Sequence, residues 1–327
     1  MYGITIDEKG LIHIADAVYT NKHKLPMEVV AAILKDRYTV DGEEPSDYSA
    51  SSLVAPIQQT ILKKRYRTKK KLKVFDVTDD FWAFYGSIAH AVLEESWHAA
   101  MGSKVEERLY TEIKGKIISG KMDCYHDGEI RDYKTTKIYK VTKGDFKDWE
   151  MQQNIYAYLC RVNNWPIKRI KIIALLNDWK AGEKKFKQNY PDCPIKIIPL
   201  RVFDQDVMEG WLEDRVANLT IAEQLSDIEL ARQYPCSNEE RWKNYQGTVV
   251  MKKGGKKASF KAESEDQQAD MLACSNYWEE RGLNEDEYDI DVRWSDPKRC
   301  MDHCPAATVC QQWAKEKPKE PEGEATF

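Results

Sequence analysis

Two aspartates and one lysine are the residues whose types and spacing most clearly suggest chemistry in this sequence. The segments GKMDCYHDG and EIRDYKTTK follow each other directly, and the Asp-Gly pair that ends the first is typical of a two-residue type I′ hairpin turn. Such a turn places Asp123 directly opposite Asp132, with Lys134 two residues further along on the same face. The pattern predicts two carboxylates and an ammonium group side by side.

This arrangement needs a physical explanation, because like charges directly opposite each other destabilise a pair of strands. The two aspartates require a cation between them, a raised pKa, or exposure to solvent. Carboxylate oxygens suit hard cations such as Mg²⁺ or Mn²⁺, and Lys134 could then hold or deprotonate a water that attacks a phosphate. A hairpin whose surface charges pair loosely is the alternative, and the hairpin alone does not decide between the two.

A histidine and a third carboxylate precede the hairpin. In GSIAH, Gly86 lies one helical turn before His90 on the same helix face, so another element can approach closely and meet the imidazole. A helix histidine that only packs is the alternative. Glu112, on the strand before the hairpin, could add a carboxylate, but we favour a solvated strand residue at that position.

A glutamine and a tyrosine follow the hairpin. In MQQNIYAYLC, Gln152 and Tyr156 share one helix face at a spacing of four, beside an apolar stripe. Such a pair could hold a phosphate and stack on a base. Alone, it would more often be a polar helix edge, so the order of all these residues along the chain is the stronger signal.

That order resembles a known family. Gly86-x-x-x-His90, then Asp123, Asp132-Tyr133-Lys134 and Gln152-x-x-x-Tyr156 are similar to the motifs of the RecB-type nuclease branch of the PD-(D/E)xK superfamily. The segments DYSASSLVAP, NDW, CSNEERW and CMDHCPAATVC extend the likeness to phage-encoded exonucleases of this branch, with CRISPR-associated spacer-acquisition nucleases as more distant relatives. The resemblance implies an α/β fold with a PD-(D/E)xK restriction-endonuclease-like core, in which helices flank a mixed central sheet.

The resemblance also implies roles for the residues. His90, Asp123 and Asp132 would bind Mg²⁺ or Mn²⁺, with the carbonyl of Tyr133 as a further ligand. Asp123, Asp132 and Lys134 would be catalytic, while Gln152 and Tyr156 would act at the edge of the site or on DNA. The expected activity is that of a DNA exonuclease in phage or bacterial recombination or replication, with a recombination or single-strand-annealing protein as partner. A spacer-processing type of endonuclease and a non-catalytic DNA-end-binding protein are the alternatives.

Three cysteines near the end of the chain predict a second metal site. Cys300, Cys304 and Cys310 lie within eleven residues, and thiolates in a reducing compartment are soft metal ligands. Many RecB-type nucleases hold a [4Fe–4S] cluster with three such cysteines and one upstream. Here Ala55 stands where the upstream cysteine is expected, and the first gap is three residues where two are usual. Small buried thiols without a metal are the alternative.

A replacement for the missing fourth ligand is therefore needed. We expect Cys236, in YPCSNEERW, because it opens the C-terminal segment that the three cysteines close. His303 and Cys274 are the rivals, and His303 could complete a zinc site locally. The family resemblance favours iron–sulfur over zinc, since spacing alone does not choose between them.

Two basic stretches could contact the DNA backbone. The net charge of −4 provides no overall basic field, so any contact with nucleic acid depends on local patches. KKRYRTKKKLK and MKKGGKKASF are the two most basic segments, and a solvated charged loop is the alternative for each. The residues expected on DNA are Lys63, Lys64, Arg65, Arg67, Lys252, Lys253, Lys256 and Lys257.

The elements that position these residues follow from apolar periodicity. We expect strands near 107–115, 120–126, 129–136, 168–177, 195–203 and 288–294, and hairpins around Glu8-Lys9-Gly10 and over 248–261. Helices are expected near 27–38, 79–100, 146–162, 204–231 and 264–281, and the stretch 46–66 offers serine N-cap candidates before a helical run that Pro56 could open. The expected organisation is an N-terminal arm (1–45), a nuclease core (46–235), a C-terminal metal-stapled module with the cysteines (236–312) and a disordered tail (313–327).

Composition sets the class of protein. The chain has 327 residues, of which 42% are hydrophobic, so a substantial core is expected. No run of about eighteen apolar residues and no signal-peptide pattern occurs, which predicts a cytoplasmic protein without membrane contact, in the host cytoplasm if phage-encoded. The eight cysteines should then be reduced.

Overall fold

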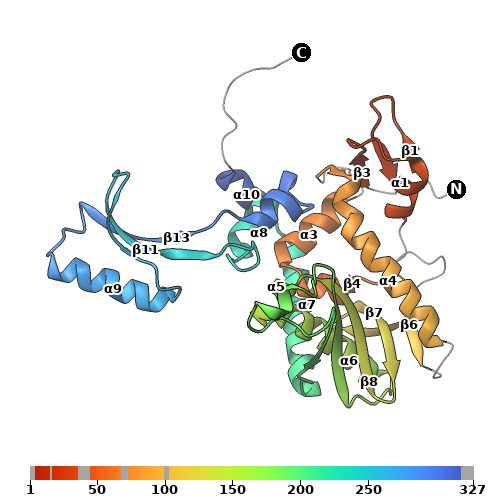
Figure 1. Ribbon diagram of the computed structural model, residues 1–327. Coiled ribbons are helices and arrows are strands. Elements are labelled where there is room, and N and C mark those ends of the chain that lie inside the picture. Colours follow the sequence, from red (N-terminus) through yellow and green to blue (C-terminus); the bar gives the residue numbers. More distant parts are fainter. Residues whose placement is uncertain (1–3, 15–16, 36–44, 68–72, 99–102, 318–327) are drawn as a thin grey trace. The chain divides into compact units, whose positions relative to one another are not determined.

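The computed structural model describes residues 4–14, 17–35, 45–67, 73–98 and 103–317 (Figure 1). The chain divides into two compact units, residues 1–230 and 231–327. Both units combine helices with β-sheets that the helices flank, so the expected mixed α/β class is confirmed. Among the described residues, no helix is long and apolar enough to cross a membrane.

A mixed six-stranded sheet forms the centre of the first unit (Figure 1). Its order is β10 (Ile195–Leu200), β9 (Arg169–Leu176), β8 (Glu129–Thr136), β7 (Lys116–His126) and β4 (Tyr48–Ser49), and β6 (Lys104–Ile113) also pairs with β7. Strands β8 and β9 are parallel, as are β4 and β7, while the other pairs are antiparallel. The expected strands in this part of the chain are all present, with ends shifted by a few residues.

Helices α4 (Phe81–His98) and α6 (Lys147–Val162) cover opposite faces of this sheet. Gly120 explains how α6 packs so closely on β7, because a Cβ there would lie 2.5 Å from a methyl carbon of Leu159. Side chains alternate along a strand, so Asp123, at an odd spacing from Gly120, projects toward α4. Because side chains alternate along β7, Asp123 and the groups beside it lie on the face of the sheet that α4 covers.

The remaining helices of this unit are α2 (Ala50–Val54), α3 (Ile57–Tyr66), α5 (Ile138–Lys143) and α7 (Gln205–Gln224). The single helix expected over 204–231 is wrong, because α7 ends at Gln224 and α8 (Asp227–Gln233) begins a new helix. Ser226 and Glu229 cause the break through a capping box, in which the Ser226 N–H donates to Glu229 Oε2 (2.9 Å) and the Glu229 N–H donates to Ser226 Oγ (3.3 Å).

The N-terminal segment forms a small sheet of β1 (Ile4–Ile6), β2 (Ile12–Ile14), β3 (Ala17–Thr20) and β5 (Phe75–Asp76). The expected hairpin is confirmed, but helix α1 (Met27–Ile33) is shorter than the predicted 27–38. Ile12, Val30 and Val77 form a core of their own, so the segment expected as an arm is a folded part of the first unit.

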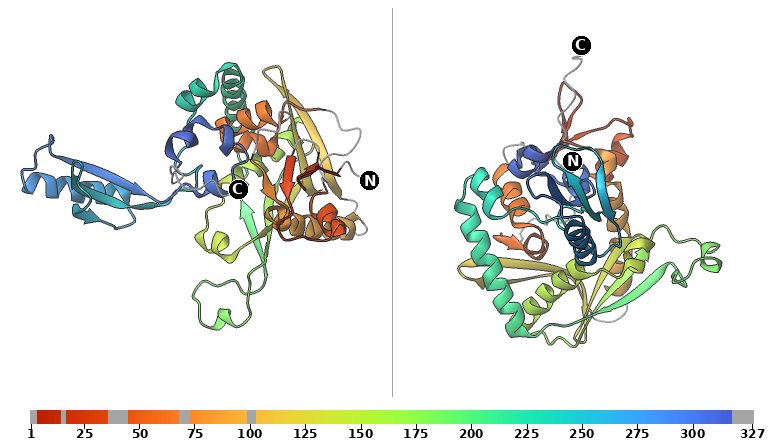
Figure 2. Two further views of the ribbon diagram at one scale, coloured as in Figure 1. Left: turned by 90° about the horizontal axis from the view of Figure 1, so that it is seen from above. Right: turned by 90° about the vertical axis from the view of Figure 1, so that its left-hand side faces the viewer.

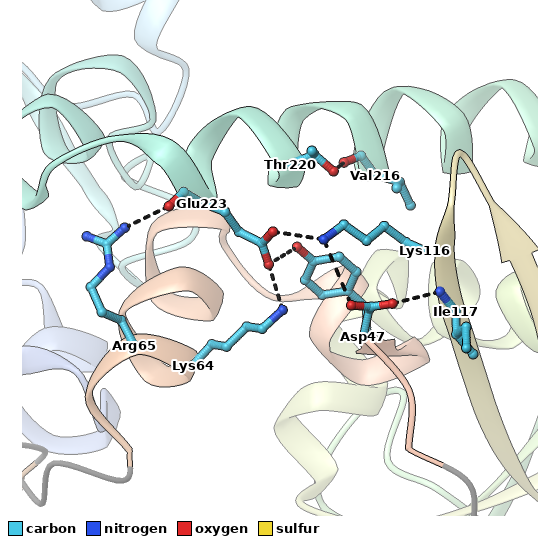
Figure 3. A network of polar contacts seen from close by, with 9 residues as sticks. Asp47, Lys64, Arg65, Lys116, Ile117, Val216, Thr220 and Glu223 are labelled. Carbon is cyan, nitrogen blue, oxygen red and sulfur yellow. Dashed lines mark hydrogen bonds and ion pairs between the residues drawn. The ribbon is translucent and has the colours of Figure 1, made fainter.

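A partly buried carboxylate on α7 ties three other elements of the first unit to that helix (Figure 3). Glu223, on α7, accepts hydrogen bonds from Tyr48 Oη (2.8 Å), Lys64 Nζ (2.6 Å) and Lys116 Nζ (3.0 Å). Burial raises the pKa of this carboxyl, but the three hydrogen bonds outweigh burial and lower the pKa from 4.5 to about 2. Because the folded pKa lies below the unfolded one, this contribution is present above pH 4.5 and is lost as pH falls toward 2.

We therefore expect Glu223→Gln to lower the free energy of unfolding at pH 7 by about 3 kcal/mol, and by much less at pH 3. Urea unfolding of both proteins at the two pH values measures the difference. Glu213→Gln is the matched control on the same helix, because Glu213 pairs with Lys114 at the surface and both side chains are about half exposed. If Glu223→Gln lowered the free energy of unfolding as much at pH 3 as at pH 7, this result would contradict the assigned pKa.

The second unit contains an antiparallel sheet of order β12 (Ala258–Ala262), β11 (Tyr245–Lys252) and β13 (Tyr288–Trp294). Helix α9 (Gln267–Glu280) packs along this sheet, as Figure 2 shows. The cysteine-rich end follows as a π-helical turn (Arg299–His303), a 3-10 turn (Ala307–Val309) and α10 (Gln311–Glu316). The disordered tail expected from residue 313 thus begins as helix, and 318–327 lie outside the described residues.

Candidate active site and cysteine cluster

The hairpin that carries the two aspartates forms as the turn predicts. Asp127 and Gly128 both have positive φ, 42° and 78°, as a type I′ turn requires. Cys124 pairs with Arg131, Tyr125 with Ile130 and His126 with Glu129, which is the predicted register. One step further along, the carboxylate of Asp123 accepts the backbone N–H of Tyr133 at 2.8 Å. The side chain of Asp123 is thereby fixed against the neighbouring strand.

His90 reaches this hairpin from α4. Its Nε2 donates to the carbonyl oxygen of Tyr133 at 2.8 Å, and its Nδ1 lies 3.5 Å from Asp123 Oδ2. A Cβ on Gly86 would make ordinary contact with Thr135 at 3.7 Å, so α4 and β8 approach closely at that point. The Tyr133 carbonyl, expected as a metal ligand, accepts the histidine N–H, and its role as a ligand stays a prediction.

Glu106 joins the group and was missed from the sequence. The ligand atoms of His90, Glu106 and Asp123 all lie within 4.8 Å of one another. Glu112, which the sequence offered, pairs instead with Ile117 near the far end of β6. The run KVEERL alternates like an ordinary strand, and only the register of β6 on β7 shows that Glu106 lies opposite Asp123.

Burial and charge act in opposite directions on the two aspartates. Burial, and then the charge of Asp132, raise the pKa of Asp123 well above its usual value, against the influence of Lys134. Asp132 is almost fully buried, and Lys134 Nζ lies 2.9 Å from its Oδ2, although that oxygen forms no well-aligned hydrogen bond. One imidazole nitrogen and several carboxylate oxygens around an excess of negative charge form a donor set that fits Mg²⁺ or Mn²⁺.

The predicted glutamine–tyrosine pair forms on α6, where Gln152 Nε2 donates to Tyr156 Oη at 2.9 Å. Tyr156 is buried against β7, and a Cβ on Gly120 would lie 2.8 Å from its ring. This contact is on the face of β7 opposite the one that bears Asp123. The pair is not brought to the His90 group, so its contact with DNA stays a prediction.

The first basic stretch is partly engaged within the protein. Lys64 bonds to Glu223, while Arg65 forms an ion pair with Asp227 and donates to the carbonyl of Leu225 at 2.9 Å. Lys64 and Arg65 therefore have partners within the protein, and their contact with DNA stays a prediction. Lys63 and Arg67 are exposed on α3 and its end, and 68–72 lie outside the described residues.

The second basic stretch forms the expected hairpin tip, between β11 and β12. Lys252 and Lys253 make only surface ion pairs, at 3.2 Å with Glu287 and 3.8 Å with Asp289. Such exposed pairs are weak and exchange readily with other partners. Lys256 and Lys257 are exposed at the tip, so this hairpin presents cations to solvent.

The cysteine cluster of the second unit includes Cys236. Gln312 clamps its backbone with two hydrogen bonds, of 2.8 Å from the Cys236 N–H and 3.0 Å to its carbonyl. Burial, and after it the charges of Glu240 and of the thiols of Cys310, Cys304 and Cys300, raise the pKa of Cys236 to about 12. The four predicted ligands thus lie within electrostatic reach of one another.

The surroundings of the cysteines favour Cys236 over Cys274 and His303 as the fourth ligand. Cys274 is buried on α9, where the group that most affects its pKa besides burial is Asp270. His303 packs its ring on Trp242, with the centroids 5.0 Å apart. The Sγ of Cys310 accepts the backbone N–H of Trp313 at 3.4 Å, a contact that stabilises a thiolate. Metal binding by the cluster stays a prediction.

No protein-family model and no curated protein sequence matches the chain. Among solved structures, it is similar to the protein SSO0001, with 16% identity and a TM-score of 0.41 over 59% of this chain and 85% of that one. A candidate exonuclease from Eubacterium rectale matches with 19% identity and a TM-score of 0.29, over 45% and 56%. A phage-related exonuclease from Haemophilus somnus 129PT matches with 14% identity and a TM-score of 0.27, over 60% and 81%.

Proposed function

We propose that this chain is a deoxyribonuclease that hydrolyses phosphodiester bonds with Mg²⁺ or Mn²⁺. One observation carries the proposal: His90, Glu106 and Asp123 converge on the α4 face of the sheet, beside the ion pair of Asp132 and Lys134. Three carboxylates and an imidazole suit a hard divalent cation, and a lysine within the same group suits the activation of water. The order of these residues along the chain resembles the RecB-type nucleases.

Each side chain has a role in this proposal. His90 and Asp123 would hold the cation, and Asp132 would contribute a further carboxylate and orient Lys134. The cation would polarise the scissile phosphate and lower the pKa of a water. Lys134 positions or deprotonates the attacking water and offsets negative charge that develops on the phosphate. The backbone N–H of Tyr133 keeps the Asp123 carboxylate in one orientation.

DNA contact is proposed for the exposed cations. Lys256 and Lys257 at the tip of the β11–β12 hairpin, with Lys252 and Lys253 beside them, present four ammonium groups that could follow a phosphate backbone. We favour an exonuclease that acts in phage or bacterial recombination or replication, where a recombination or single-strand-annealing protein would be its partner. The likeness of the motifs to phage-encoded exonucleases supports that choice over a spacer-processing endonuclease.

A cleavage assay tests the proposal. End-labelled single-stranded and double-stranded DNA and a covalently closed circle are incubated with the protein and Mg²⁺ or Mn²⁺, and in parallel with EDTA. We expect the linear DNA to be degraded only with the metal and the circle to remain intact. Nicking of the circle would identify an endonuclease. DNA binding without metal-dependent cleavage would leave the DNA-end-binding alternative and refute the nuclease.

A further inference from the structure

We propose that Glu106 is a ligand of the divalent cation, which adds a carboxylate from the first strand of the sheet to the residues on the helix and hairpin. The inference rests on the proposed nuclease function and deepens it. It also changes the ligand set, because the motif order along the chain includes His90 and Asp123 but not Glu106.

The register of β6 on β7 brings Glu106 to the site. Val105 pairs with Cys124 and Glu107 pairs with Met122, so Glu106 is the residue that lies opposite Asp123. Residues opposite each other on paired strands share one face of the sheet. The φ of Glu106 is 53°, a local irregularity of the backbone at this position. The pairing of the two strands thus places a second carboxylate beside Asp123.

The orientation of His90 indicates that a cation belongs between these groups. Because Nε2 donates to the Tyr133 carbonyl, a neutral imidazole keeps its lone pair on Nδ1. Nδ1 lies 3.5 Å from Asp123 Oδ2, so that lone pair faces an oxygen that also accepts hydrogen bonds. A metal-bound histidine typically donates its other N–H to a backbone carbonyl or carboxylate, which is the arrangement found for His90.

The charges around Glu106 allow its carboxylate to pair with Lys121 and to bind a cation at the same time. Lys121 Nζ lies 2.6 Å from Glu106 Oε2, and Lys134 Nζ lies 2.9 Å from Asp132 Oδ2. Together with Asp123, three carboxylates then face two ammonium groups, which leaves one negative charge uncompensated. A carboxylate has two oxygens, so Glu106 can remain paired with Lys121 and still bind a cation. Lys121 in this view orients Glu106 and is not itself part of the cation site.

Mn²⁺ binding without DNA tests the assignment independently of cleavage. Free Mn²⁺ is followed by EPR in titrations of the wild-type protein and of Glu106→Gln, Asp123→Asn, Glu107→Gln and Lys121→Met. Glu107 is exposed and adjacent in sequence, so it is the matched control for loss of one carboxylate from β6. We expect Glu106→Gln to bind Mn²⁺ about tenfold more weakly or worse, Asp123→Asn to lose binding, and Glu107→Gln to match the wild type.

Lys121→Met separates a ligand from a structural ion pair. Both Lys121→Met and Glu106→Gln break the pair between them, but only Glu106→Gln removes a ligand. We expect Lys121→Met to bind Mn²⁺ as tightly as the wild type or more tightly, since it removes a positive charge. Equal weakening in the two variants, or wild-type binding by Glu106→Gln when Asp123→Asn has lost it, would overturn the inference alone. Failure of the wild type to bind Mn²⁺ would refute the proposed function as well.

Discussion

Replacing Lys134 by methionine is expected to slow DNA cleavage by about a thousandfold while leaving Mn²⁺ binding intact. Methionine preserves most of the length of the side chain but removes the ammonium group that lies 2.9 Å from Asp132. If Lys134 acts on water and on the charge of the phosphate, its loss affects the transition state and not the affinity for the cation. Single-turnover cleavage of end-labelled DNA measures the rate of the chemical step.

Two variants make this result specific. Lys137→Met removes an exposed lysine three residues later, at the start of α5, and is expected to cleave at the wild-type rate. Asp132→Asn is expected to lose activity and also to weaken Mn²⁺ binding, because it removes a carboxylate from the site. If Lys134→Met cleaves as fast as Lys137→Met, Lys134 has no catalytic role, whatever the other variants show.

The second large effect concerns the cysteine cluster. We expect the protein purified under anaerobic conditions to contain iron and sulfide, or zinc, and Cys236→Ser to lose most of it. Because binding of a structural metal contributes directly to folding, its loss is expected to destabilise residues 231–327 by several kcal/mol. Elemental analysis gives the metal content, and limited proteolysis reports whether this unit opens.

Cys274→Ala is the matched control for that experiment, because Cys274 is a buried thiol of the same unit outside the cluster. It is expected to keep the metal. A Cys236→Ser protein with full metal occupancy would exclude Cys236 as the fourth ligand and leave His303 as the next candidate. A wild-type protein without metal under anaerobic conditions would leave the four thiols as packing residues.

The candidate active site was predictable from sequence where local rules determine geometry. The Asp127-Gly128 pair adopts positive φ at both positions, which few other residues tolerate, and the turn then sets the register of the hairpin. From that register, Asp123, Asp132 and Lys134 necessarily share a face. Helices α4 and α6 were predictable for the same kind of reason, since apolar periodicity reports which face of a helix is buried.

Local rules also placed one boundary that periodicity alone missed. The run over 204–231 is apolar at helical spacing throughout, which favours one long helix. The capping box of Ser226 and Glu229 nevertheless starts α8, because two reciprocal hydrogen bonds satisfy backbone donors that a helix start leaves free. The Ser-x-x-Glu signature was readable in the sequence.

What the sequence by itself determined is therefore the hairpin, the spacing of its charged groups and the helices beside it. Only the tertiary structure decided which distant groups meet them. Glu106 meets Asp123 through the register of β6 on β7, Gln312 binds the backbone of Cys236, and Lys64 pairs with Glu223 on a helix far along the chain. Those contacts depend on how elements pack, and packing is set by the shape and charge of many residues together, which no short motif records.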